Sequence, residues 1–261
     1  MQKLICATLL LTAIACSEEA VASRGRVVES SAGTVELGIK TGGYTPGTVS
    51  GASSITGVVA ATGTSGDSSV AVQRDARVCG DSAVVRAVRL NGTSLANALV
   101  WVEGVTSGKP LPETKRTTVT IERCQFDPRV TAVVAGSTVN VLSRDRASHN
   151  VRFYREGNGN PVATILTVDA GQVVPSETIA DKAGIVEARC EMHPWVRAYV
   201  AVFDHPYFAI TDDKGSFTID QLPAGTYTVK VWHEGMSQAA EQRVALSGEG
   251  AGQVQLQVAL R

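Results

Sequence analysis

The segment Cys190-Glu191-Met192-His193-Pro194-Trp195-Val196 decides how this chain is interpreted. Further upstream, a second histidine occurs in Ser148-His149-Asn150-Val151. One thiolate and two imidazoles in a trigonal plane are the donor set that mononuclear electron-transfer copper prefers, with only a weak fourth contact. His149, Cys190 and His193 are therefore candidate copper ligands.

The surroundings of these residues indicate how they meet. A histidine just past the end of one strand and a cysteine closing another strand can lie together at one end of a β-sandwich. The tight Cys190-x-x-His193 turn then brings the second imidazole back to the same metal. Pro194 stiffens this return, because its ring fixes its own φ and restricts the residue before it.

Composition and periodicity predict an all-β protein. The 261 residues, 44% of them apolar, suffice for hydrophobic cores in one large or two small domains. The clearest periodic stretches, such as 118–121 and 227–232, alternate with period two, and no long segment shows a helical stripe. A net charge of −1 at pH 7 gives no indication of a nucleic-acid partner.

Residues 115–203 carry a series of motifs in a recognisable order. These are the runs 117–128, 136–141, 148–151, 183–197 and 199–203. The order resembles the cupredoxin family, and most closely its amicyanin branch, whose ligand loop has two residues between Cys and His and a proline after the His. The resemblance implies a Greek-key β-sandwich, copper held by His149, Cys190 and His193, and Asn150 as the neighbouring residue that ties the two ligand loops by hydrogen bonding.

Val196 departs from this family pattern, which has a methionine three residues after the ligand histidine. Valine cannot coordinate, so copper here is expected to be three-coordinate, with Cu(II) disfavoured and the reduction potential raised. Met192 is an alternative ligand, although it lies inside the tight loop. A further alternative is that the loop has lost its metal and persists as a packing element with a free thiol.

Residues 204–261 resemble a second family, the carboxypeptidase regulatory-like module, which is a small transthyretin-like β-sandwich. Asp213-Lys214-Gly215 and Leu222-Pro223-Ala224-Gly225 are predicted turns between its strands. Residues 54–114 contain runs that match the first strands of such a module. We therefore expect the cupredoxin-like segment to be inserted within it, and we expect His205 and His233 to have structural roles at the contact between the domains.

The N-terminus is predicted to be a targeting segment. Residues 1–15 have a positive start, an apolar run and a lipobox-like end before Cys16, which predicts a bacterial lipoprotein with lipid on that cysteine. An ordinary secretory peptide cut near the same position is the alternative. Residues 16–53 are rich in Ser, Gly, Ala and Thr, as a flexible tether is. Both alternatives export the chain, to the periplasmic or cell-surface side of the envelope.

Export determines the expected state of the cysteines. Cys6 leaves with the signal peptide, Cys16 carries lipid and Cys190 lies between the two histidine segments. Cys79 and Cys124 remain, and in an oxidising compartment they are expected to pair. The competing assignment pairs Cys190 with one of them and destroys the copper site.

The sequence thus predicts an exported, lipid-anchored type 1 copper protein that passes electrons to a redox protein of the cell envelope. No arrangement of nucleophile, base and acid is apparent, so we expect no enzyme activity. The exposed edge of His193, beside Pro194 and Trp195, is the expected electron port. The alternatives are a metal-free binding or adhesion lipoprotein and a copper storage or delivery protein.

Overall fold

A computed structural model describes residues 27–33, 39, 43–64, 66–156 and 159–261. The described chain is almost entirely β-structure, which confirms the predicted fold class. Its helical elements are one short helix, α1 (Ala76–Cys79), and one 3-10 turn, η1 (Thr178–Ala180). In the described ranges no helix is long and apolar enough to cross a membrane. The signal peptide, Cys16 and half of the expected tether lie outside the described residues.

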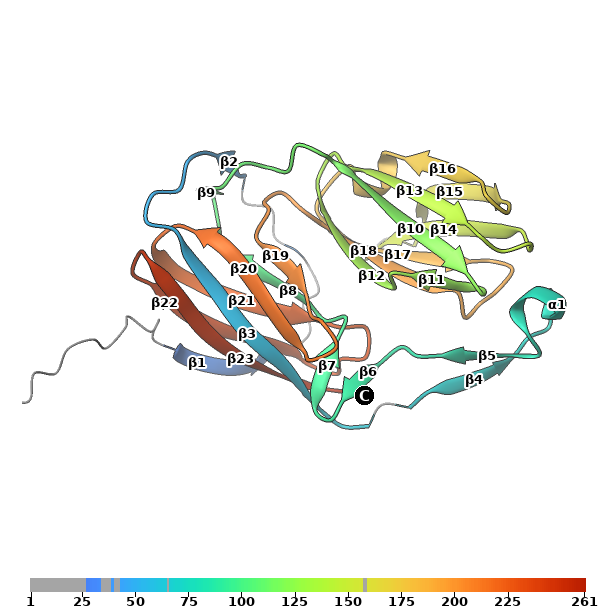
Figure 1. The fold of residues 1–261 in the computed structure, drawn as a ribbon, viewed down its shortest axis with the longest axis horizontal. Coiled ribbons are helices and arrows are strands. Elements are labelled where there is room, and N and C mark those ends of the chain that lie inside the picture. The colour runs from blue at the N-terminus through green and yellow to red at the C-terminus, as the bar shows by residue number, and fades with distance from the viewer. Residues whose placement is uncertain (1–26, 34–38, 40–42, 65, 157–158) are drawn as a thin grey trace, which may run out of the picture.

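The strands form two units that lie side by side in Figure 1. The first unit combines strands from both ends of the sequence. One of its sheets has the order β1-β22-β21-β8-β19, and the other has the order β20-β3-β7-β6 with β23 beside β3. The bounds are β1 (Val27–Gly33), β3 (Ser53–Thr62), β6 (Arg89–Asn91), β7 (Ser94–Ala96), β8 (Leu99–Glu103), β19 (Phe208–Ile210), β20 (Ser216–Leu222), β21 (Gly225–Trp232), β22 (Ala239–Leu246) and β23 (Gly250–Ala259).

The second unit contains the strands between residues 116 and 203. Its two sheets have the orders β11-β10-β13-β16 and β12-β18-β17-β14-β15. The bounds are β10 (Arg116–Glu122), β11 (Gln125–Asp127), β12 (Val130–Val134), β13 (Thr138–Ser143), β14 (His149–Arg155), β15 (Pro161–Val168), β16 (Val173–Ser176), β17 (Gly184–Cys190) and β18 (Arg197–Phe203). The chain enters this unit from the short strand β9 (Ser107–Gly108), which pairs with β2 (Thr45–Pro46), and leaves it toward β19.

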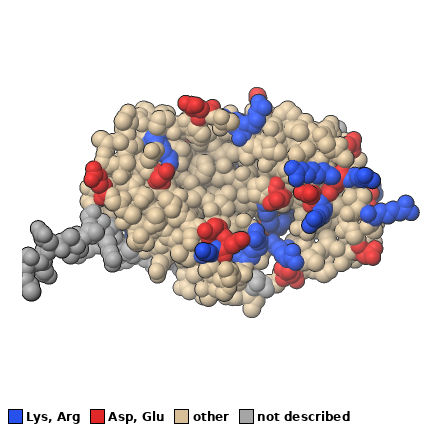
Figure 2. All heavy atoms as spheres, in the orientation of Figure 1, with Lys and Arg blue, Asp and Glu red and all other residues tan. Residues whose placement is uncertain are grey.

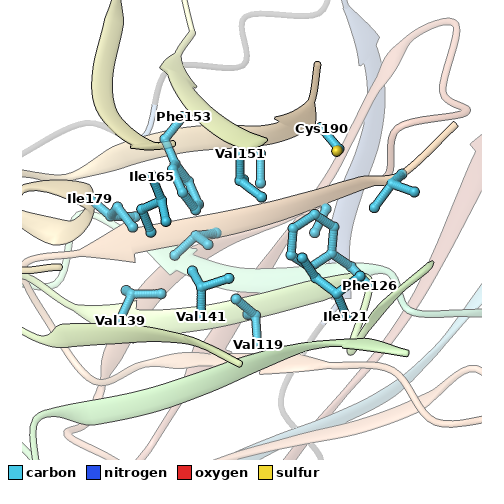
Figure 3. Packing of buried hydrophobic residues seen from close by; sticks show 14 of the residues in the cluster. Val119, Ile121, Phe126, Val139, Val141, Val151, Phe153, Ile165, Ile179 and Cys190 are labelled. Carbon is cyan, nitrogen blue, oxygen red and sulfur yellow. The ribbon is translucent and has the colours of Figure 1, made fainter. Parts of the chain in front are cut away.

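Period-two alternation explains why these segments are strands. In β13 every second residue is fully buried, and in β10 Val119 and Ile121 are fully buried, while the other residues of both strands are at least partly exposed. Figure 3 shows Val119 and Val141 of these strands facing Val151 and Phe153 of β14 across the core. Two sheets that each bury one face in this way pack as a sandwich. Cys190 lies at the edge of the same core.

A third apolar cluster and an ion pair join the two units. Trp101 of β8 and Trp232 of β21 pack with Phe203 of β18, and Ile39, Leu99, Val130, Ile185 and Ala201 complete the cluster. Beside it, the Arg129 guanidinium donates two hydrogen bonds to the Glu234 carboxylate, from Nε to Oε1 and from Nη2 to Oε2. The bidentate geometry fixes the direction of this contact as well as its strength.

An arm formed by residues 67–86 leaves the first unit between β3 and β6 and reaches along the second unit (Figure 1). It consists of β4 (Ser68–Ala71), α1 and β5 (Ser82–Val85), with β4 and β5 paired only with each other. Its tip is joined to the second unit by the predicted disulfide Cys79–Cys124, with the Cα atoms 5.4 Å apart. The bridge spans 45 positions of sequence, and closing a loop of that length stabilises the fold by about 4 kcal/mol in the chain-entropy picture.

His205 and His233 are both buried in the first unit, with 4% and 2% of their surface exposed. The amide of Tyr207 donates to His205 Nδ1, and the amide of Gly235 donates to His233 Nδ1. Burial lowers the pKa of both imidazoles, and that of His233 falls to about 4. These contacts support the structural roles expected for the two histidines.

The pKa of His233 predicts acid sensitivity. The unfolded chain binds this proton below the ordinary value of 6.5, whereas the folded chain binds it only near 4. The contribution of His233 to the free energy of unfolding should therefore be complete above pH 6.5. The free energy of unfolding should fall by about 3 kcal/mol as the pH drops toward 4. His233→Asn keeps an acceptor for Gly235 and removes the titration, so denaturant unfolding at pH 7 and pH 4.5 should show a smaller difference than in the wild type. An equal difference would contradict the assignment.

Candidate metal centre

Strand register brings the three predicted ligands together. His149 begins β14 and Cys190 ends β17, and these strands are antiparallel neighbours in which Val151 lies opposite Cys190. Because alternate residues of a strand share a face, His149 and Cys190 both point into the sandwich. His193 follows in the loop to β18. All three side chains are buried, with 0%, 3% and 0% of the surface of His149, Cys190 and His193 exposed.

The donor atoms form a compact triangle. Cys190 Sγ lies 3.7 Å from His149 Nδ1 and 3.6 Å from His193 Nδ1. The three donors lie within 4.8 Å of one another. Ligand atoms at about 2.1 Å from a metal in a trigonal plane are separated by roughly 3.6 Å, given the bond lengths usual for nitrogen and sulfur ligands. The residues present therefore fit a small transition-metal ion with a thiolate and two imidazoles.

Carboxylates hold the outer nitrogen of each imidazole. Asp145 Oδ2 lies 3.0 Å from His149 Nε2, and Asp75 Oδ2 lies 3.1 Å from His193 Nε2. A carboxylate accepts here, so each Nε2 carries a hydrogen and each Nδ1 is the ring nitrogen that faces Cys190 and binds a metal once it has no proton. This tautomer is the one that a metal between the three donors requires.

Sequence reasoning missed both aspartates. Asp145 lies four residues before His149, and in retrospect a carboxylate so close to a candidate ligand is a local signal. Asp75 is 118 positions from His193 and lies on the arm, in another part of the chain. No sequence pattern near His193 indicates it, because only the three-dimensional course of the arm brings the two together.

Asp145 also orders the turn that carries the disulfide. Its two oxygens accept hydrogen bonds from the amides of Arg123 and Cys124, at 2.6 and 2.8 Å. Both of these residues have positive φ, 52° and 54°, a conformation that non-glycine residues adopt only where surrounding contacts stabilise it. A single buried carboxylate therefore links the Cys124 turn to the ligand His149.

Electrostatics favour a charged pair in the metal-free centre. Burial disfavours the imidazolium form of His149 and the thiolate form of Cys190, but the hydrogen bonds of these two side chains outweigh the effect of burial. The hydrogen bonds that His149 makes with Asp145 and Cys190 raise the pKa of His149 to about 9. The hydrogen bond with His149 lowers the pKa of the Cys190 thiol. The pKa of His193 is lowered, by burial and then by the neighbouring His149. The centre thus favours a thiolate, which is the form of cysteine that binds metals.

Backbone hydrogen bonds define the ligand loop. The amide of Cys190 donates to the Val196 carbonyl at 3.0 Å, and the amide of Val196 donates to the His193 carbonyl at 2.8 Å. The Val196 side chain is fully buried. Met192 is half-buried and packs against the core of the second unit. The loop is therefore closed by its own peptide groups.

Asn150 ties the two loops in a different way from the one expected. Its backbone carbonyl accepts a hydrogen bond from the amide of Glu191 at 2.8 Å. Its side-chain Oδ1, however, is buried with no hydrogen-bond partner in the structure. The link between the loops therefore runs through the peptide group of Asn150 and not through this side-chain oxygen.

The expected electron port is wrong. His193 is fully buried and Trp195 is 7% exposed, so only Pro194 of the three residues reaches the surface. The physical reason is the arm, which places Asp75 over the outer nitrogen of His193. Trp195 is turned inward, where its Nε1 donates to the Cys124 carbonyl at 3.0 Å.

The disulfide prediction is confirmed in full. Cys79 pairs with Cys124, and Cys190 is the free cysteine among the described residues. The competing pairing of Cys190 is therefore wrong in this structure. Cys124 is also near Asp145 and His149, but a sulfur in a disulfide is not a thiolate donor, so these three residues do not form a second metal site.

A model of the carboxypeptidase regulatory-like domain matches residues 183–261. The match begins in the second unit, since it includes β17 and β18, and continues to the end of the first unit. It therefore starts earlier than residue 204, where the sequence predicted that this module resumes. A search of curated proteins found no match.

Similar solved structures include several cupredoxins. A purple cupredoxin from Nitrosopumilus maritimus is 19% identical over 33% of this chain and 98% of its own, with a TM-score of 0.29. A reduced variant of amicyanin is 23% identical over 35% of this chain and 85% of its own, with a TM-score of 0.31. A copper-containing nitrite reductase from Thermus scotoductus is 20% identical over 40% of this chain and 24% of its own, with a TM-score of 0.30.

The contacts of Asp145 predict a large effect of its removal. Asp145→Ala leaves two backbone amides and the His149 ring without their acceptor in a buried place, so the free energy of unfolding should fall by about 3 kcal/mol. Denaturant unfolding of the metal-free protein measures this. Asp169→Ala is the matched control, because Asp169 is exposed and accepts one hydrogen bond from Ser148. Equal losses in the two variants would refute the role assigned to Asp145.

Proposed function

We propose that this chain, which joins a cupredoxin-like β-sandwich to a carboxypeptidase regulatory-like module, is an exported type 1 copper protein that transfers electrons. The observation that carries the proposal is the triangle of Cys190 Sγ and the two imidazole Nδ1 atoms, 3.6 and 3.7 Å from the sulfur. Bound copper would supply a reversible change of one unit in charge. His149, Cys190 and His193 would hold it.

The surrounding residues would keep the ligands in place when the charge changes. Asp145 and Asp75 fix the two rings through their outer nitrogens, and the peptide groups of Val196 close the ligand loop. A centre held in this way needs little movement between its two oxidation states, which favours fast electron exchange. In this proposal the protein is a carrier and not an enzyme.

Electrons would enter and leave on the side of Cys190 rather than through His193. Arg189 and Glu191, the covalent neighbours of the cysteine, are both exposed. Tyr154 contacts both residues. The Arg189 guanidinium stacks over the Tyr154 ring, 4.9 Å from its centroid, and the Tyr154 hydroxyl donates to Glu191 at 3.4 Å. On the face drawn in Figure 2, Lys, Arg, Asp and Glu are intermixed over the second unit, at the right of the view. A redox protein of the cell envelope, with mixed charges of its own, is the proposed partner.

The proposal includes attachment to the envelope. The apolar run before Cys16 supports export and lipidation of that cysteine. The lipid would be the protein's only contact with the membrane, on the periplasmic or cell-surface side.

One structural observation favours a second candidate function, noncatalytic binding. A cleft of about 640 Å³ lies between the two units, lined by Tyr154 and Tyr199 of the second unit, by Trp232 of the first and by charged residues. Its size suits a small molecule or a short peptide. In that alternative the metal triangle would be only a packing element. A copper storage or delivery role is the third candidate, and it requires Cu(I) to bind far more tightly than Cu(II).

Adding Cu(II) to the metal-free mature protein tests the proposal directly. An intense visible band from the thiolate-to-copper transition is expected, and Cys190→Ser should abolish it. His233→Asn, which alters a buried histidine away from the centre, should leave the band unchanged. A colourless protein that binds neither Cu(II) nor Cu(I) would eliminate both copper functions and favour binding in the cleft. Tight Cu(I) binding without the Cu(II) band would favour storage or delivery.

The position of Val196 predicts the direction of a change in potential. A methionine there should supply the weak axial contact that valine lacks and stabilise Cu(II). Val196→Met should therefore lower the reduction potential by roughly 100 mV, or about 2.3 kcal/mol per electron. Val196→Leu is the control, because it adds bulk without a donor. If voltammetry shows an unchanged or higher potential in Val196→Met, the Val196 side chain does not face the metal, and Met192 is the next residue to test.

A further inference from the structure

The arm supplies the centre with a residue from outside the sandwich. Asp75 lies at the tip of the arm, just before α1, in the left-handed conformation with φ 60° and ψ 31°. Its carboxylate is in contact with His193 Nε2, and its side chain is 34% exposed while that of His193 is 0% exposed. Asp75 thus stands between a candidate metal ligand and the solvent.

The inner face of the arm packs against the second unit through apolar side chains. Ala83 is part of the core of that unit, and Val72, Val78, Cys79 and Val85 pack against it. The side chain of Gln125 in β11 donates to the Val84 carbonyl at 3.0 Å. The contact is therefore a packed apolar interface and not a chance approach of a loop.

Apart from this interface and the disulfide, few contacts among the described residues hold the arm in this position. Strands β4 and β5 pair only with each other, and all four residues of β4 are exposed. An isolated two-stranded hairpin is at best marginally stable in water. The position of Asp75 should therefore depend on the Cys79–Cys124 bridge four residues further along the chain.

We propose that the arm is a cover over the metal centre, with Asp75 as a positioning residue for His193 and the Cys79–Cys124 disulfide as its latch. The proposal rests on the proposed function for the identity of the metal, but the closed arm shields Cys190 with or without copper. When the latch is closed, reagents and chelators reach the centre slowly. A dithiol reductant opens the latch by converting the bridge to two thiols, with two electrons and two protons, and itself becoming a disulfide. The arm then lifts, Asp75 leaves His193 and the centre becomes accessible.

The rate at which a small alkylating reagent modifies Cys190 in the metal-free protein tests the cover. At fixed pH, peptide mass analysis should show slow modification of the wild type and at least tenfold faster modification of the Cys79→Ala/Cys124→Ala double variant. Cys190 should also be modified faster in Asp75→Ala than in the wild type, although this variant removes only one partly exposed carboxylate. Asp67→Ala is the matched control, because Asp67 lies on the same arm and pairs with Arg86 at 3.1 Å and not with a candidate ligand.

The tautomer of His193 tests the positioning role separately. Imidazole nitrogen NMR of the metal-free protein should find the hydrogen on Nε2 in the wild type and a mixture of tautomers in Asp75→Ala. Asp75→Asn keeps an oxygen acceptor and should restore the Nε2–H form. For the copper protein, transfer of the metal to a chelator should be faster in Asp75→Ala than in Asp67→Ala.

The outcomes separate this proposal from the proposed function. If Cys190 is modified no faster in the double variant and in Asp75→Ala than in the wild type, the cover is refuted, even when the protein binds copper. If the variants differ as expected but the wild type binds no copper, the cover stands and the electron-transfer function fails. An unchanged His193 tautomer in Asp75→Ala would refute the positioning role.

Discussion

The Asp145 carboxylate is the contact on which the candidate centre depends. Its oxygens accept hydrogen bonds from the amides of Arg123 and Cys124 and lie 3.0 Å from His149 Nε2. The first two bonds hold a turn with two residues at positive φ, and the third fixes the orientation of a ligand. Since Cys124 carries the disulfide, the same carboxylate connects the metal centre to the anchor of the arm. The burial of Asp145 makes each of these bonds costly to lose.

The centre therefore has an inner and an outer layer with different origins. The inner layer comes from the sandwich itself, where the register of β14 against β17 and the short loop after Cys190 place the three donors. The outer layer on the side of His193 comes from the arm, which belongs to the sequence before the sandwich begins. An insertion usually depends on its host only for its two connections. Here the host also contributes Asp75 and five apolar residues to the inserted part.

The sequence was sufficient to predict the features that depend on local residue pattern and on side-chain chemistry. Alternation in runs such as 118–121 predicted strands, the Cys190–His193 spacing predicted the triangle, and subtraction of the other cysteines predicted the Cys79–Cys124 bridge. The exposure of His193 could not be predicted in this way, because it depends on Asp75, 118 positions away. The side chain of Asn150 was also misjudged. The hydrogen bond between the loops was expected from the asparagine side chain. The peptide carbonyl of Asn150 makes it instead, and every residue has such a carbonyl.

The disulfide also changes how the two units are connected. The chain crosses between them once after β9 and once before β19, and the Cys79–Cys124 bridge is a third covalent crossing, from the arm. Two bodies joined at one point rotate freely, and two points leave a hinge axis, but three points that do not lie on one line remove that axis. Together with the Arg129–Glu234 ion pair and the apolar cluster between the units, the bridge limits how far they can turn against each other. Cleavage of the backbone at either connection would leave the two units covalently attached.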